Sequence, residues 1–108
     1  MLQGTVVENS LGDSSVLSRI HILKSWEAGS WKLHKIEAGR EFALEIAKCL
    51  LDGPWYVHFW ESGKDDVLVV YKERYFDIVY SDKNTWHSAV EYGKSIGIPE
   101  EQLDFIIG

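Results

Sequence analysis

Apolar residues recur at intervals of three and four in two segments of the chain, and this spacing predicts two helices. In residues 40–51 the recurring apolar residues are Phe42, Ala43, Ile46, Ala47 and Leu50. In residues 84–96 the corresponding residues are Trp86, Ala89, Val90 and Gly93. Each set lies on one side of its helix, and we expect that side to pack against the rest of the protein.

Other apolar positions alternate with polar ones or form short β-branched and aromatic runs, which predicts strands. The expected strands are residues 2–9, 19–26, 31–37, 55–61, 66–72 and 75–80. In the last two strands one side is wholly apolar or aromatic and carries Val67, Val69, Tyr71, Phe76, Ile78 and Tyr80. We expect this side to meet the helices, together with Trp55, Val57 and Phe59 of the strand before.

Two further segments have weaker patterns. Residues 10–18 are rich in turn-forming residues and are typical of one helical turn capped by Asp13 or Ser14. Pro99 followed by two glutamates indicates a short final helix. The apolar residues after it predict that the C-terminal segment docks onto the protein, and they are Leu103, Phe105, Ile106 and Ile107.

The order of elements is strands, a helix, three strands and a helix, which predicts an α+β protein. We expect residues 1–108 to form a single α+β domain, because 12.4 kDa is the size of one domain. The expected architecture is a mainly antiparallel sheet with two helices packed on one face. A ferredoxin-like or related split β-α-β topology is the nearest named arrangement.

The sheet face away from the helices carries the candidate binding residues. If residues 63–65 form a three-residue loop, residue 60 lies opposite residue 68 and residue 58 opposite residue 70. This register gathers large aromatic and polar residues on one face, and the tentative binding residues are Tyr56, His58, Trp60, Tyr75 and Asp77. Contiguous aromatic surface of this kind usually marks a contact.

Three interpretations of that face stay open. The N-terminal strands, with Trp26 or Trp31, could fold over it and bury it. It could form a homodimer contact, since tryptophan and tyrosine are favoured at interfaces. It could also bind a ligand or single-stranded nucleic acid by stacking.

Charge narrows the choice of partner. The chain has 17 acidic and 11 basic residues, a formal net charge of −6, so it repels phosphate backbones and anionic lipid headgroups. We therefore expect neither nucleic acid nor a membrane as partner. A single cysteine, Cys49, cannot form an internal disulfide, and neither a signal peptide nor an apolar run of membrane-spanning length is present. A cytoplasmic protein is the expectation.

The sequence lacks the established motifs for metal and cofactor binding, so we expect no metal and no cofactor. His34 and His58 could lie on neighbouring strands, but two ligands make a weak metal site. His58 is the best candidate for chemistry, since a histidine among aromatic residues could act as a general base. The alternative is a partly buried histidine that only packs. No catalytic residue is assigned.

Two runs carry a resemblance to a known group of proteins. Residues 53–60 read Gly-Pro-Trp-Tyr-Val-His-Phe-Trp, and residues 97–105 read Gly-Ile-Pro-Glu-Glu-Gln-Leu-Asp-Phe. Together they resemble a family of short uncharacterised prokaryotic proteins. The resemblance implies a single-domain cytoplasmic protein and assigns no catalytic or binding residue.

The leading functional hypothesis is a small non-enzymatic binding domain that associates with itself or with a protein partner through the aromatic sheet face. The alternative is a small cofactor-independent enzyme, or a small-ligand binder, with a pocket near His58. The enzyme version rests on analogy of fold alone.

Overall fold

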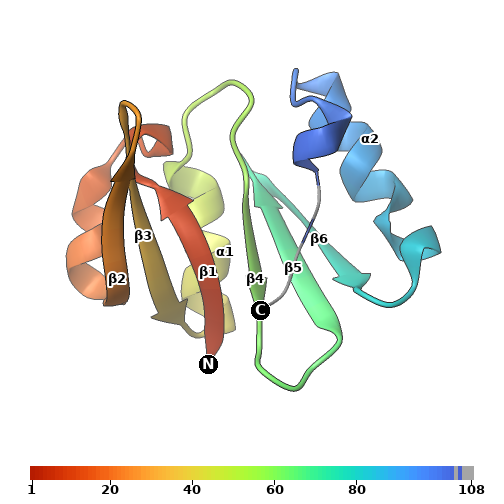
Figure 1. Ribbon diagram of the computed structural model, residues 1–108, viewed down its shortest axis with the longest axis horizontal. Helices are drawn as coiled ribbons and strands as arrows, with labels where there is room; N and C mark the ends of the chain where they lie inside the picture. Colours follow the sequence, from red (N-terminus) through yellow and green to blue (C-terminus); the bar gives the residue numbers. More distant parts are fainter. Residues whose placement is uncertain (104, 106–108) are drawn as a thin grey trace.

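The computed structural model describes residues 1–103 and 105. In this part of the chain six strands form one antiparallel sheet in the order β2–β3–β1–β4–β5–β6, with two α-helices beside it (Figure 1). The strands are β1 (Leu2–Val7), β2 (His21–Ala28), β3 (Trp31–Ala38), β4 (Val57–Trp60), β5 (Asp66–Tyr71) and β6 (Arg74–Val79). The helices are α1 (Arg40–Cys49) and α2 (His87–Ser95). Short 3-10 helices are η1 (Glu8–Ser10), η2 (Ser14–Arg19), η3 (Lys83–Trp86) and η4 (Glu100–Gln102).

The α+β class and the antiparallel sheet are confirmed, but the ferredoxin-like topology is not. β1 lies between β3 and β4 and is antiparallel to both, so β3 and β4 run in the same direction. α1 connects these two strands across β1. β2 extends the sheet beyond β3, and β5 and β6 extend it beyond β4 as a meander. This strand order differs from the ferredoxin-like order.

The prediction that both helices pack on one face of the sheet is wrong. α1 packs on the face that carries Val6, Ile36, Phe59, Leu68 and Val70, which we call the α1 face. α2 packs on the opposite face, the α2 face, which carries Val67, Val69, Tyr71, Phe76 and Ile78. β5 therefore contributes to both hydrophobic cores. The physical reason is its unbroken apolar run from residue 67 to residue 71, which offers apolar side chains to both faces.

The predicted apolar side of β5 and β6 is correct, because it forms the sheet side of the α2 core. Tyr71 illustrates how closely the helix approaches. Its side chain is fully buried, and its hydroxyl donates a hydrogen bond to the carbonyl oxygen of Ala89 in α2 at 2.6 Å. Burial raises the pKa of the Tyr71 hydroxyl far above its usual range, so the group acts here as a neutral donor.

The predicted register between β4 and β5 is wrong by one residue. Trp60 pairs with Val67 and His58 pairs with Val69, not with residues 68 and 70. Successive side chains of a strand point to opposite faces, so a shift of one residue exchanges the faces of the whole strand. Tyr56, His58 and Trp60 consequently lie on the α2 face, and Val57 and Phe59 join the α1 core.

The short elements follow local sequence signals. The Asp13 side chain accepts a hydrogen bond from the Ser15 backbone N–H at 3.0 Å and caps η2, as predicted. Leu103 and Phe105 are buried in the α2 core, in agreement with a docked C-terminal segment, whereas Ile106 and Ile107 lie outside the described residues. No described helix has the length and apolar character needed to cross a membrane.

β2 is an edge strand, and all eight of its residues are exposed. The α2 face is uncovered over β2, where Trp26 is exposed. The β2–β3 hairpin has three further exposed large apolar side chains, which are Ile22, Leu23 and Trp31. The sheet thus presents covered and uncovered parts of the same face side by side.

Candidate functional site

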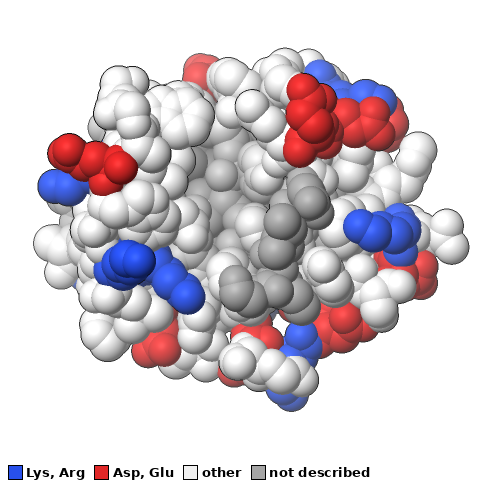
Figure 2. Space-filling view, viewed as in Figure 1, with Lys and Arg blue, Asp and Glu red and all other residues white. Residues whose placement is uncertain are grey.

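A cavity of about 440 Å³ opens on the α2 face, beside the uncovered part of the sheet. Its floor and walls include Thr5 and Val7 of β1, Trp31 of β3, Trp55 and Tyr56 just before β4, and His58 of β4. The remaining wall is formed by Pro54, Gly97, Pro99 and Gln102. Figure 2 looks onto this face and shows that it is hollowed near its centre.

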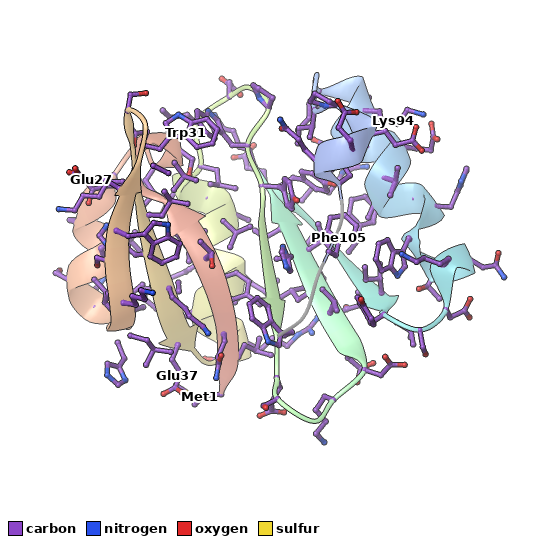
Figure 3. The ribbon with its side chains drawn as sticks, in the orientation of Figure 1. Met1, Glu27, Trp31, Glu37, Lys94 and Phe105 are labelled. Carbon is purple, nitrogen blue, oxygen red and sulfur yellow. The ribbon has the colours of Figure 1, made fainter. Side chains whose placement is uncertain are left out.

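Four of the ten described residues that line the cavity carry aromatic rings: Trp31, Trp55, Tyr56 and His58. The ring centroids of Trp31 and Trp55 lie 5.5 Å apart, which joins the β2–β3 hairpin to the loop before β4. Figure 3 shows Trp31 at the end of the hairpin nearest that loop. On the floor, the His58 ring is stacked between Tyr56 at 6.1 Å and Trp60 at 5.4 Å. The cavity is therefore an aromatic-lined pocket, which we call the Trp31–His58 pocket.

Phe105 packs against two of the aromatic residues that line the pocket. Its side chain is fully buried, and its ring centroid lies 5.6 Å from that of Tyr56 and 5.9 Å from that of His58 (Figure 3). The Tyr56 hydroxyl donates a hydrogen bond to the carbonyl oxygen of Gln102 at 2.5 Å. These contacts fix the C-terminal segment against β4, so the wall that it contributes is held in place.

Side chains form rows across the α2 face, because antiparallel partners point to the same side. Thr5 pairs with Lys35 of β3, and Lys35 pairs with Lys24 of β2. The β1–β4 register pairs Gln3 with Trp60, and its continuation places His58 opposite Thr5. A polar row therefore crosses the sheet, and we call it the Lys24–His58 row.

The next row toward the mouth of the pocket is apolar. Val7 pairs with Leu33, and Leu33 pairs with Trp26. The same continuation of the β1–β4 register places Tyr56 opposite Val7. An apolar strip thus runs beside the polar row, and the pocket spans both.

Of the residues predicted to bind, Tyr56 and His58 line the pocket. Trp60 lies beside His58 but is only 8% exposed, so it is a core residue of the α2 face. Tyr75 and Asp77 do not join them. They pair with Val70 and Leu68 of the α1 face, and the predicted shared surface is therefore wrong.

Asp77 has a different role from the one expected. Its two carboxylate oxygens accept hydrogen bonds from the Arg40 guanidinium at 2.8 Å each. The guanidinium carbon of Arg40 lies 5.8 Å from the Tyr75 ring centroid, and the hydrogen bonds that Arg40 donates to Asp77 raise the pKa of Arg40. This cluster ties the start of α1 to the edge strand β6, on the face opposite the pocket.

Sequence reasoning missed Thr5 and Trp55 as pocket residues and placed Trp31 as a cover for the sheet. The missing information was the position of β1 between β3 and β4, which brings residues far apart in sequence to one place. A local signal existed at Trp55, which follows Gly53 and Pro54 in a loop instead of lying inside a strand.

His34 and His58 are not neighbours, because β1 separates their strands and they point to opposite faces. His34 is 4% exposed and uses both ring nitrogens. Its Nε2 lies 3.0 Å from a Glu8 carboxylate oxygen, and its Nδ1 lies 2.7 Å from the Ser25 hydroxyl. An ionised carboxylate only accepts, so in the neutral ring Nε2 carries the proton and Ser25 donates to Nδ1. The cluster joins η1, β3 and β2.

Comparisons with protein-family models, with curated proteins and with solved structures find no match. Within residues 1–103 and 105, no group of three or more histidine, cysteine, aspartate or glutamate side chains is placed to hold a metal ion.

Proposed function

We propose that this protein is a small-ligand-binding domain, and that the Trp31–His58 pocket holds a planar, largely apolar group. The observation that carries the proposal is the wall of aromatic rings, which come from β3, the loop before β4, and β4 itself. Ligand pockets are typically clefts of about 300–1,000 Å³ that are lined by aromatic and apolar side chains with few polar groups. The cavity of about 440 Å³ falls in this range.

The shape of the pocket favours a flat ligand. The floor rings Tyr56 and His58 stack on each other with an angle of 25° between their planes, which holds both rings in a fixed orientation. Trp31 and Trp55 line the same pocket. Offset stacking on aromatic rings contributes about 0.5–1.5 kcal/mol per pair beyond the area buried. A planar aromatic group gains most from such an arrangement.

Binding without chemistry fits the polar groups of the pocket. The Tyr56 hydroxyl is already engaged with the Gln102 carbonyl oxygen, and Asp77 lies on the other face of the sheet. None of the described residues that line the pocket is acidic. The Thr5 hydroxyl is a polar group of the lining that can contact a ligand.

Trp31→Ala is expected to weaken binding of naphthamide, an uncharged planar probe, by about tenfold, which corresponds to the loss of one stacking wall. Binding can be followed through tryptophan fluorescence and confirmed by calorimetry. Trp26→Ala is the matched control, because Trp26 is exposed on the same hairpin and the same face but does not line the pocket. Equal losses in the two variants, or no binding by the unmodified protein, would contradict the proposal.

Self-association is a second candidate function, supported by the exposed apolar side chains of the β2–β3 hairpin. Ile22, Leu23 and Trp26 are each at least 36% exposed on the edge strand β2. Light scattering at micromolar concentration should then give about twice the monomer mass of 12.4 kDa. Trp26→Lys should restore the monomer by placing a charge in the contact, whereas Trp60 is unsuitable for this test because it is a core residue. A monomeric unmodified protein would remove this candidate.

A further inference from the structure

The Lys24–His58 row places positive charge beside the pocket of an acidic protein. Lys24 and Lys35 lie next to each other on the α2 face, and Lys35 lies next to Thr5, which lines the pocket. The formal net charge of the chain is −6, so this pairing of lysines runs against the overall balance. Figure 2 shows basic side chains on this face over the β2 and β3 side of the sheet.

Four of the eleven lysine and arginine side chains of the protein form an ion pair with a carboxylate among the described residues, and seven, including Lys24 and Lys35, do not. Arg40, Lys72 and Lys94 each form an ion pair with a carboxylate. Among the described residues, neither Lys24 nor Lys35 forms one, and Lys24 instead lies 5.7 Å from the Trp26 ring centroid. Glu37 lies further along β3 on the same face, and its carboxylate is 3.7 Å from the His21 ring. The positive charge of the row is therefore available to a bound group.

The row is close enough to the pocket to act on its ligand. Neighbouring strands of a sheet lie about 4.8 Å apart, so the Lys35 backbone is one strand from Thr5 and two strands from His58. A lysine side chain is long and flexible, and its ammonium can extend over the neighbouring strand. The Thr5 hydroxyl and the Lys35 ammonium can then meet the same ligand group at the rim of the pocket.

From this arrangement we propose that the natural ligand is a planar aromatic anion. Its ring occupies the Trp31–His58 pocket, and its carboxylate or phosphate group lies on Lys35 and the Thr5 hydroxyl, with Lys24 as the next cation along the row. This inference rests on the proposed function and adds the charge of the ligand to it. Aromatic pockets also bind organic cations, but the two lysines repel a cation at this rim.

The test compares three probes with the same ring system: naphthamide, naphthoate and naphthyl phosphate. The unmodified protein should bind naphthoate about fivefold more tightly than the uncharged naphthamide, as expected for one partly exposed ion pair. The difference should shrink at high salt, because exposed charges are screened. Whichever of naphthoate and naphthyl phosphate binds more tightly identifies the anionic group.

Lys35→Gln should abolish the preference for the anions and leave the affinity for naphthamide unchanged. Lys32→Gln is the matched control, because it removes the same charge three residues away on β3 from a residue that points to the opposite face. Circular dichroism and thermal unfolding verify that both variants keep the fold.

The outcomes separate the inference from the function on which it rests. Equal binding of naphthamide and naphthoate, or equal losses in the Lys35 and Lys32 variants, overturns the inference and leaves the aromatic pocket standing. Failure of all three probes to bind overturns both.

Discussion

Phe105→Ala is expected to lower the free energy of unfolding by about 3–5 kcal/mol, the usual cost of deleting a fully buried phenylalanine side chain. The Phe105 ring is 0% exposed and contacts the rings of Tyr56, His58 and Trp86. It therefore joins β4 to the start of α2. A loss of this size is a large fraction of the about 5–15 kcal/mol by which a domain is typically stable.

Urea unfolding followed by tryptophan fluorescence measures the effect. Tyr75→Ala is the control, because Tyr75 is 49% exposed at the edge of the sheet, and we expect a loss below about 1 kcal/mol there. Phe105→Leu should recover much of the stability, since leucine fills most of the same volume. Similar small losses for alanine at both positions would show that Phe105 does not fill the α2 core. A stable Phe105→Ala variant that binds naphthamide normally would show that the pocket does not need this support.

Gly4→Ala is expected to destabilise the protein by about 3 kcal/mol, the upper part of the range for overpacking a core. A methyl group at Gly4 would lie 2.7 Å from a Phe59 ring carbon and 2.8 Å from the backbone carbonyl oxygen of His58. The backbone oxygen cannot move aside without separating β1 from β4, which pair at this point. The clash thus opens the sheet at its centre.

Gly39→Ala provides the comparison for Gly4. A methyl group at Gly39 meets nothing within 4 Å, and its φ of −72° suits any residue. The lower chain entropy of alanine in the unfolded state and its weaker capping of α1 act in opposite directions, so we expect a change of less than about 1 kcal/mol. Unfolding curves of the two variants can be compared directly. A Gly4 variant as stable as the Gly39 variant would mean that β1 and β4 are less tightly joined than described.

The elements with strong local patterns were predictable from the sequence, whereas the faces on which they meet were only partly so. The side of β5 and β6 that faces α2 followed from alternation, because successive residues of a strand point to opposite faces. In β4 both sides are apolar or aromatic, so polarity does not indicate which side faces which helix. The unbroken apolar run of β5 was the available sign that layers cover both faces of the sheet.

The candidate site was predictable only where it depends on one strand. Tyr56 and His58 share a side of β4 in any register, and both line the pocket. Thr5 and Trp31 reach it through pairings of β1 with strands much further along the chain, which no local pattern reveals. Asp77 was assigned to the same surface through an incorrect loop length between β4 and β5, and its true partner, Arg40, lies in a helix.

The position of β1 at the centre of the sheet also bears on how the chain assembles. β2 with β3, and β4 with β5 and β6, are joined by short turns, so each group closes with little loss of loop entropy. β1 pairs with distant residues on both of its sides. Leu2 pairs with Ala38 of β3, and Gln3 pairs with Trp60 of β4. Contacts between residues so distant in the chain carry the largest loop-closure cost and slow the search for the native arrangement. The strand that completes the floor of the pocket is thus also the one that unites two locally formed halves of the sheet.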